Sequence, residues 1–248
     1  MDSFNIAIAG LSVEVHPLFE TTREYCKAYL TDDQSELSVS ISADDLVIQQ
    51  KLLDQEAVDE GIKFRKFTDP FLERAVIQRK VADALLLRNT LMLHGSTVSV
   101  DGSAYLFTAP CKTGKSTHTR LWRELFGNRA VIVNDDMPFL RLTSSEVIAC
   151  GSPWNGKHGL SANISVLLKG ICFLHRGDKN VIKRADPEFV IDLLQHQAYT
   201  PADDNLQEKA HSLVCDLADR VALWEMYCTK DLDAAKIAYS AMTAVIND

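Results

Sequence analysis

The first third of the chain combines alternating and helical patterns of apolar residues. Residues 4–15 and 37–41 alternate between apolar and polar positions, which predicts one or two strands and then another. Helices are predicted over residues 17–30 and 44–55, and a further short strand over residues 62–67. The pattern therefore favours a small region that combines helices with strands.

The clearest helix of this region runs from Pro70 to Arg88. Its apolar residues form a broad stripe at helical spacing, and Pro70 suits the first helical turn after Asp69. No linker rich in Pro, Gly or Ser follows it. We therefore expect residues 1–90 to form an accessory α+β lobe and residues 91–248 to form the core that carries the chemistry.

The core is predicted to begin with a β-hairpin. Residues 91–100 and 103–108 are rich in strand-forming residues, and Asp101-Gly102 between them is a strong signal for a two-residue turn. These two strands should therefore pair antiparallel. A helix over residues 116–126 and a buried strand over residues 130–134 are expected next.

The rest of the chain predicts a further mixture of strands and helices. Residues 180–183 are expected to pair with the strand before them, across the turn at residues 177–179. The expected strands cover residues 139–142, 146–149, 164–168, 170–174, 180–183 and 221–226; the expected helices cover 186–198, a stretch from the polar break at 200–204 to about 218, and 231–245.

The segment between the hairpin and the helix that follows it, residues 109–116, reads APCKTGKS. Its end fits the pattern G-x-x-x-x-G-K-[ST], in which backbone N–H groups wrap nucleotide phosphates, the lysine reaches the outer phosphates and the hydroxyl holds Mg²⁺. A strand before the loop and a helix after it are the required setting, and the helix N-terminus adds its positive dipole end. The residues expected to bind ATP are Lys112, Thr113, Gly114, Lys115, Ser116 and Thr117.

An acidic pair, Asp135-Asp136, follows the predicted buried strand 130–134. Beside a phosphate loop, one such carboxylate can hold Mg²⁺ and the other can accept a proton. The alternative is an ordinary acidic turn, because Asp-Asp before Met-Pro is common turn chemistry. The neighbouring loop favours the functional interpretation.

The order of these features resembles the catalytic domain of bacterial HPr kinase/phosphorylases. The shared features are His94-Gly95, the hairpin, the loop that ends in G-K-S, and Asp135-Asp136. More distantly, the order resembles phosphoenolpyruvate carboxykinases, which share that nucleotide-binding core. The resemblance is specific over residues 91–136 and weaker to about residue 230. It implies an α/β fold with a P-loop core, a mixed sheet and ATP and Mg²⁺ as cofactors.

This resemblance also implies roles for individual residues. The protein would be a kinase that phosphorylates a Ser or Thr hydroxyl of a protein or peptide. Asp135 would accept the proton of that hydroxyl, Asp136 and Ser116 would hold the metal, and Lys115 would hold the outer phosphates. His94 would lie near the transferred phosphate or the carboxylates.

The chain departs from the family pattern in the loop itself. HPr kinase loops are glycine-rich, whereas this chain has Ala109, Cys111 and Lys112 where the pattern has Gly, Ser and Gly. These departures support a rival reading, a nucleotide-binding regulatory protein without catalysis. A phosphotransferase with a small-molecule acceptor, or a carboxykinase-like reaction, is a further alternative.

A glycine-rich segment, residues 151–159, follows the second hairpin and contains Lys157 and His158. Both residues are candidates for contacts with phosphate or substrate. The alternative is a packed surface turn with Trp154 as a staple. His118, on the helix after the phosphate loop, is expected to face outward and to be an ordinary surface residue.

Composition excludes some classes of function. The net charge is −8, which disfavours a nucleic-acid binder. No run of 18 or more apolar residues exists, and no basic region precedes the first apolar run, so neither a membrane span nor a signal peptide is expected. The six cysteines include no C-x-x-C pair, which fits a reducing cytoplasm.

The acceptor and the assembly stay open at this point. HPr itself, a ribosomal peptide precursor or another protein could carry the acceptor hydroxyl. HPr kinases are hexamers, so a homo-oligomer is a candidate state, but the first third of this chain shows no resemblance to them.

Overall fold

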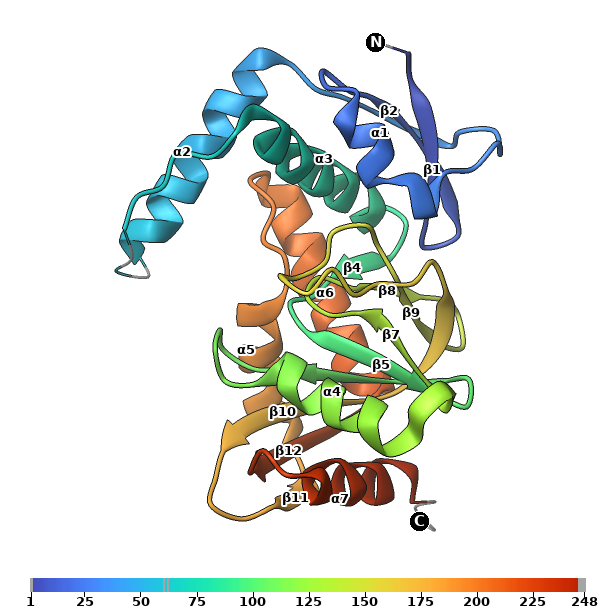
Figure 1. Cartoon of the computed structure of the whole chain (residues 1–248), viewed down its shortest axis with the longest axis vertical. Coiled ribbons are helices and arrows are strands. Elements are labelled where there is room, and N and C mark those ends of the chain that lie inside the picture. Colours follow the sequence, from blue (N-terminus) through green and yellow to red (C-terminus); the bar gives the residue numbers. More distant parts are fainter. Residues whose placement is uncertain (1, 60, 62, 245–248) are drawn as a thin grey trace. The chain divides into compact units, whose positions relative to one another are not determined.

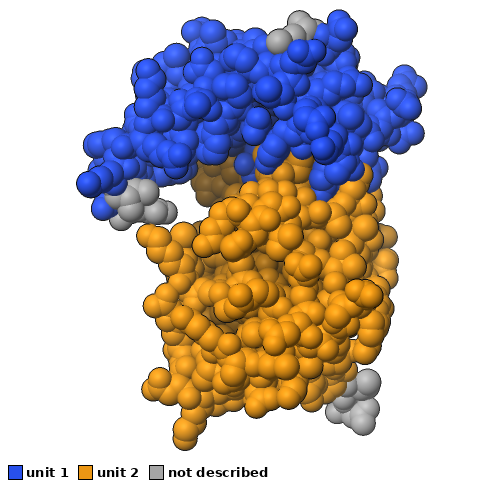
Figure 2. All heavy atoms as spheres, in the orientation of Figure 1, with its two compact units in different colours: residues 1–84 blue, residues 85–248 orange. Residues whose placement is uncertain are grey.

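The computed structural model describes residues 2–59, 61 and 63–244. The chain divides into two compact units, residues 1–84 and residues 85–248, which Figure 2 shows in two colours. The division falls near the end of helix α3 (Asp69–Leu86). Each unit has its own sheet.

The first unit contains a three-stranded sheet with helices. Strands β1 (Phe4–Ile8) and β2 (Leu11–His16) pair antiparallel, and β3 (Leu37–Ser40) pairs parallel to β2. The strands predicted in residues 4–15 and 37–41 are thereby confirmed. Apolar side chains on alternate positions, among them Ile6, Ile8, Val13 and Val15, are fully buried and form the core of this unit.

Two predictions for the first unit need correction. The helix expected over residues 17–30 is two short pieces, α1 (Thr21–Tyr25) and a 3₁₀ turn over Lys27–Tyr29. Residues 63–67 form no strand, and residue 62 lies outside the described residues. The two long helices, α2 (Ala43–Asp59) and α3, agree with the predicted periodicity.

The second unit is a mixed α/β structure built on a nine-stranded sheet. The strand order is β4-β8-β9-β10-β6-β5-β7, and β12 pairs with both β10 and β11. The strands are β4 (Thr90–Met92), β5 (Ser96–Val100), β6 (Ser103–Thr108), β7 (Ala130–Asn134), β8 (Phe139–Leu142), β9 (Val147–Cys150), β10 (Ser165–Arg176), β11 (Val181–Arg184) and β12 (Ala222–Cys228).

Helices cover both faces of this sheet (Figure 1). Helices α4 (Lys115–Phe126) and α7 (Leu232–Thr243) pack into one apolar cluster, which contains the fully buried Trp122. Helices α5 (Pro187–Gln197) and α6 (Asp204–Arg220) pack into the other. The unit therefore has three layers, with the sheet in the middle.

Strand directions bring several segment ends to one edge of the sheet. Strands β10 and β12 run parallel to β6. Strand β7 also runs in the direction of β6, because β5 lies between them and pairs antiparallel with both. The carboxyl ends of β6, β7, β10 and β12 thus point the same way, and the segments that follow them meet at that edge.

The predicted hairpin is present, but its first strand is interrupted. Asp101 and Gly102 have φ of 49° and 78°, as a tight turn between β5 and β6 requires. Residues 93–95 lie between β4, which pairs with β8, and β5, which pairs with β6 and β7. At Gly95 an added Cβ would lie 2.9 Å from Leu106 Cδ2, so the chain bends closely past β6 here and the expected single strand 91–100 is wrong.

Two further expectations about the sheet are also wrong. The strands predicted at 164–168 and 170–174 are one strand, β10, whose register shifts between Leu168 and Gly170. The exposed Lys169 at this irregularity interrupts the apolar pattern but not the strand. Strand β11 pairs with β12 and not with β10, because β12 already occupies that edge of β10.

Within the described residues, no helix is both long enough and apolar enough to cross a lipid bilayer.

Candidate functional site

The loop of residues 109–114 connects the end of β6 with the start of α4. Gly114 has a φ of 127°, a conformation that side chains disfavour, so this glycine is required by the backbone. Lys112 also has a positive φ, of 64°, at the position where the family pattern has a glycine. The amide of Thr113 donates to the carbonyl of Pro110 at 3.3 Å, which closes the loop into a compact turn.

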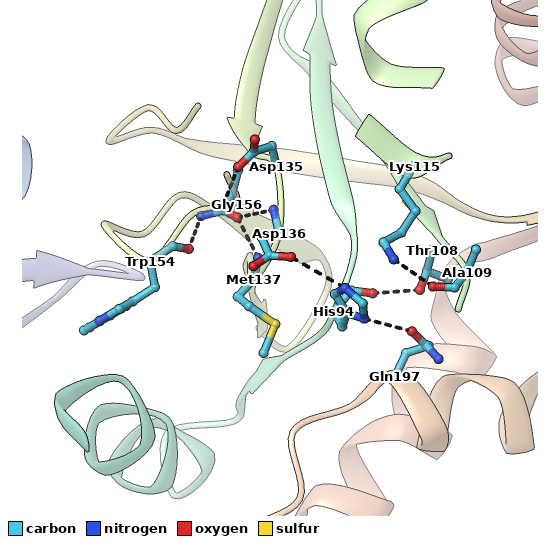
Figure 3. A network of polar contacts seen from close by, with 11 residues as sticks. His94, Thr108, Ala109, Lys115, Asp135, Asp136, Met137, Trp154, Gly156 and Gln197 are labelled. Carbon is cyan, nitrogen blue, oxygen red and sulfur yellow. Dashed lines mark hydrogen bonds and ion pairs between the residues drawn. The ribbon is translucent and has the colours of Figure 1, made fainter. Parts of the chain in front are cut away.

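Lys115, the lysine of the motif, lies inside this loop. Its Nζ donates to the carbonyl oxygen of Ala109 at 2.8 Å, and the residue is only 8% exposed (Figure 3). Burial lowers the pKa of Lys115, while Cys111 and Asp136 act in the opposite direction. A partly desolvated ammonium group at the first residue of a helix is suited to an anionic ligand.

Asp135 is a buried carboxylate at the end of β7. It is 3% exposed, and its Oδ1 accepts a hydrogen bond from the amide of Gly156 at 2.7 Å. Its Oδ2 is buried without a hydrogen-bond partner. Burial raises the pKa of Asp135, and the hydrogen bond from Gly156 opposes this shift. A carboxylate with a raised pKa and one free oxygen is suited to accept a proton or to bind a cation.

Asp136 turns its carboxylate towards His94. The Nε2 of His94 lies 3.5 Å from Oδ1 of Asp136, and the Nδ1 of His94 lies 3.2 Å from Oε1 of Gln197, at the end of α5 (Figure 3). The amide of Gly95 donates to the carbonyl of Asp136 at 2.8 Å, so the bend before β5 and the acidic pair are joined through the backbone as well. His94 therefore lies between the acidic pair and α5.

Asn134, which precedes the acidic pair, fixes two loops at once. Its Oδ1 accepts hydrogen bonds from the amides of Asp136 and Met137 at 2.8 and 2.7 Å. Its Nδ2 donates to the carbonyls of Ser152 and Trp154 at 3.2 and 3.0 Å. The side chain is fully buried, so these bonds set the direction in which the two carboxylates leave the strand.

A cavity of about 490 Å³ lies beside the first turns of α4. It brings together four residues that the sequence singles out: Ser116, Thr117, Asp135 and His158. Lys157 is exposed and is not part of the cavity wall. The wall consists of Ser116, Thr117, Thr119, Arg120, Arg123, Ile132, Asp135, His158 and Leu160.

A second cavity, of about 450 Å³, lies next to the same loop. It shares only Thr117 with the first, and it is walled by the carboxyl ends of β10 and β12. Arg176 reaches from β10 to the loop and donates to the carbonyl of Lys112. The wall consists of Thr113, Gly114, Thr117, His118, Leu121, Leu174, Arg176, Gly177, Asp178, Cys228, Thr229 and Lys230.

His118 does not face outward, contrary to the sequence expectation. It is 2% exposed, and burial lowers its pKa to about 4. Its Nε2 accepts a hydrogen bond from Nε1 of Trp122 at 3.2 Å, one turn further along α4. The helix therefore presents His118 to the core together with Leu121 and Trp122, and a neutral imidazole replaces the expected surface residue.

The arrangement fits a magnesium ion that is shared with phosphates. Within the described residues, no group of three or more His, Cys, Asp and Glu side chains is placed to hold a metal. Magnesium bound with a nucleotide needs only one or two protein ligands, because phosphates and water complete its shell. The hydroxyl of Ser116 and the carboxylates of Asp135 and Asp136 are oxygen ligands of the required kind.

Several residues of the two cavity walls, and Gln197 beside His94, carry no motif in the sequence. Arg120, Arg123, Arg176 and Gln197 were not singled out, because folding, and not spacing along the chain, brings them to the site. Asn134 had a local signal, since an Asn immediately before an acidic pair and a turn commonly bonds to the backbone two residues on.

Comparisons with known proteins identify only a distant similarity. No family model matches the chain, and no curated protein matches it. Among solved structures, that of the HPr(Ser) kinase/phosphatase from Coxiella burnetii is similar with 15% sequence identity and a TM-score of 0.30, over 50% of this chain and 94% of that chain. A match this distant assigns neither a fold family nor an activity to this protein.

Proposed function

We propose that the protein is an ATP-dependent kinase of the HPr kinase type, which transfers a phosphoryl group to a Ser or Thr hydroxyl of a protein or peptide. The observation that carries the proposal is the cavity in which Ser116, on the first turn of α4, faces the buried and half-unpartnered carboxylate of Asp135. Phosphoryl transfer requires mainly that reactants are positioned and charge is neutralised.

The phosphates of ATP bind in the loop of residues 109–114 and at the N-terminus of α4. Backbone N–H groups from Thr113 to Thr117 surround them, and Lys115 exchanges its contact with the Ala109 carbonyl for one with the outer phosphates. The nucleoside enters the cavity walled by Leu121, Leu174 and Arg176. Apolar side chains with an arginine at the edge suit a flat heterocyclic base.

Mg²⁺ neutralises part of the phosphate charge when it is bound. Ser116 and Asp136 are assigned as its protein ligands, and Asp135 as the proton acceptor of the substrate hydroxyl. The raised pKa of Asp135 supports this division, because a general base works best when its pKa approaches the working pH. In the alternative assignment Asp135 binds the metal and Asp136 accepts the proton. It is favoured by the cavity that Asp135 shares with Ser116, the other metal ligand.

His94, Lys157 and His158 complete the assignment. His94 contacts Asp136 and would orient that carboxylate. His158 lines the Asp135 cavity and would face the acceptor. Lys157 is assigned to the substrate side as well, on the strength of its place beside His158 in the sequence.

A nucleotide-binding regulatory protein is the second candidate. The observation that favours it is Lys112, which holds a positive φ of 64° with a side chain at a glycine position of the family loop. Such a protein would bind ATP through Lys115 but transfer no phosphate. Phosphotransfer to any acceptor therefore separates the two candidates.

The test compares Asp135→Asn with Asp136→Asn. Transfer of the terminal phosphate of labelled ATP is measured on a library of Ser- and Thr-containing peptides, and Mg²⁺-dependent ATP binding is measured by titration. Asp135→Asn should keep ATP binding and lose transfer about 10²–10⁴-fold, the usual contribution of a general base. Asp136→Asn should weaken the Mg²⁺ dependence of ATP binding.

The opposite pattern would exchange the two roles. If Asp135→Asn abolishes Mg²⁺-dependent binding while Asp136→Asn only slows transfer, Asp136 is the base. If the wild type transfers phosphate and neither substitution changes the rate, the acidic pair is not part of the active site and the assignment is wrong.

A further inference from the structure

Helix α4 turns a basic face towards the cavity that contains Asp135. Ser116, Arg120 and Arg123 are spaced four and three residues apart, so they lie along one side of the helix. Both arginines are exposed and line the cavity wall. Among the described residues, neither guanidinium forms a hydrogen bond or an ion pair.

This pair of arginines is unusual within a chain of net charge −8. Two other arginines of the second unit pair with carboxylates, Arg129 with Asp101 and Arg220 with Asp216. The cavity wall holds two guanidinium groups and an imidazole, but Asp135 is its only carboxylate. An open pocket with this surplus of positive charge is suited to an anionic ligand, and arginine binds carboxylates with two parallel hydrogen bonds.

The ATP phosphates are not the ligand to which this pair is assigned. The nucleotide is placed in the loop and in the other cavity, which shares only Thr117 with this one. Along α4, at about 1.5 Å per residue, Arg120 lies roughly 6 Å and Arg123 roughly 10 Å beyond Ser116. The pair therefore reaches a group that lies away from the transferred phosphate, on the side of the acceptor.

We propose that Arg120 and Arg123 form a carboxylate-binding subsite for the acceptor. The acceptor is a peptide whose Ser or Thr is followed, within about three residues, by a carboxylate, since an extended peptide spans roughly 3.3–3.6 Å per residue. The assignment of this subsite to an acceptor peptide rests on the proposed kinase function. An acidic side chain and a free C-terminus supply the same chemistry, and experiment distinguishes them.

The experiment uses three short peptides of one neutral sequence with a single serine. The first has an acidic side chain two residues after the serine and an amidated C-terminus. The second ends two residues after the serine in a free carboxylate and has no acidic side chain. The third is neutral and amidated.

Each peptide is tested with four forms of the full-length protein: the wild type, Arg120→Gln/Arg123→Gln, Arg120→Lys/Arg123→Lys, and Arg88→Gln. Arg88 is exposed and lies outside the cavity wall, so its substitution controls for the loss of a surface arginine. The readouts are kcat/KM for phosphotransfer and the stabilisation of the protein by Mg²⁺ and ATP.

The wild type should phosphorylate one or both carboxylate-bearing peptides at least tenfold more efficiently than the neutral peptide. In the double Gln variant, kcat/KM on those peptides should fall about tenfold or more, mostly through a higher KM. The reason is that charge-assisted hydrogen bonds are stronger than neutral ones. The double Lys variant should keep part of the preference, because it keeps the charge. Stabilisation by Mg²⁺ and ATP should be the same in all four forms of the protein. Arg88→Gln should have the same kcat/KM values as the wild type.

Three results would overturn the subsite: phosphorylation of all three peptides at equal, measurable rates, a loss of kcat/KM in Arg88→Gln as large as in the double Gln variant, or a double Gln variant that loses ATP stabilisation but retains the peptide preference. A binding arm separates the subsite from the kinase assignment. Fluorescently labelled peptides with alanine in place of serine are titrated without ATP. If no peptide is phosphorylated but the wild type binds carboxylate-bearing peptides more tightly than the double Gln variant does, the subsite stands and the kinase assignment fails. Equal binding by both forms removes the subsite.

Discussion

Asp135 combines two properties that a purely structural residue would avoid. Its carboxylate is almost completely buried, and one of its oxygens has no hydrogen-bond partner. A buried charged group without full pairing destabilises the folded protein, and such residues cluster at functional sites. The stability of the protein and the proposed chemistry therefore make opposite demands on this residue.

Substitution Asp135→Asn should stabilise the protein at neutral pH. Burial raises the folded-state pKa of Asp135, so its favourable contribution exists below the unfolded-state pKa of about 4 and is lost as pH rises through the folded-state value. Asparagine keeps an oxygen for the Gly156 amide and removes the buried charge. Chemical unfolding in the absence of metal should give a higher free energy of unfolding for the variant at pH 7, and a smaller difference at pH 3.

The half-exposed Asp136 provides the matched control. Its substitution by Asn removes a carboxylate that is not buried, so at pH 7 it should not raise the free energy of unfolding as Asp135→Asn does. A variant Asp135→Asn that is less stable than the wild type at pH 7 would show that the buried carboxylate is satisfied in solution, and its assignment as a poised base would lose its physical basis.

At the residue scale, the sequence could identify groups that belong to a motif and could not identify groups that only folding assembles. Lys115, Ser116 and Asp135 stand in a recognisable order along the chain, and their roles stay predictions. Gln197 meets His94 across 103 residues of sequence. Arg120 has no local signal, because an arginine on a helix is usually just a solvated surface residue.

Helix α4 connects the chemistry with the core at the scale of a single element. One side carries Ser116 and the two arginines into the Asp135 cavity, and the opposite side buries His118 and Trp122. The imidazole accepts the indole N–H and its ring contacts Phe107, with ring centroids 4.5 Å apart. His118 thus packs α4 against Phe107 of β6 while it remains neutral.

His118 should make the protein sensitive to acid between pH 6.5 and about 4. Its pKa is lowered from 6.5 to about 4 in the folded state, so the stability that it contributes is present above pH 6.5 and is lost as pH falls towards 4. The full loss is on the order of 3 kcal/mol, at 1.36 kcal/mol per pKa unit. His118→Gln, whose amide oxygen can still accept the Trp122 N–H, should flatten the pH dependence of the free energy of unfolding in this range.

His196 provides the control on α5, because it is exposed. His196→Gln controls for the loss of a histidine from the surface of a helix. An unchanged acid slope in His118→Gln would mean that His118 is accessible to protons in the folded protein, contrary to its burial.

At the element scale, the hydrophobic pattern predicted most strands and helices, because their apolar residues either alternate along a strand or recur at helical spacing. The pattern was wrong where tertiary pairing overrides it. At Lys169 an exposed charge within β10 suggested a break that the sheet does not make. Strand β11 was expected to pair with the preceding strand. Its partner is β12, which follows only after helices α5 and α6, and no local pattern encodes that pairing.

At the scale of the molecule, the topology of the second unit explains why the candidate residues meet. Strands β6, β7, β10 and β12 run in one direction, so the loop before α4, the acidic pair, Arg176 and Thr229 all lie at the same edge of the sheet. In open α/β sheets, ligands commonly bind beyond the carboxyl ends of the strands. The antiparallel β5 lies between β6 and β7, so the loop and the acidic pair follow strands that are two positions apart in the sheet.

The central claim is that this edge binds the phosphates of ATP through Lys115. Scanning calorimetry with saturating Mg²⁺ and ATP tests it most directly, on the wild type, on Lys115→Ala and on Lys51→Ala as an exposed control in the first unit. A ligand at 100 times its Kd stabilises the folded state by about 2.7 kcal/mol, which corresponds to roughly 5–10 °C in the transition of the unit that binds it. This shift is expected for the wild type and for Lys51→Ala, and no shift is expected for Lys115→Ala, whose melting temperature without ligand should be almost unchanged. Equal stabilisation of Lys115→Ala by ATP, or no stabilisation of the wild type, would contradict it.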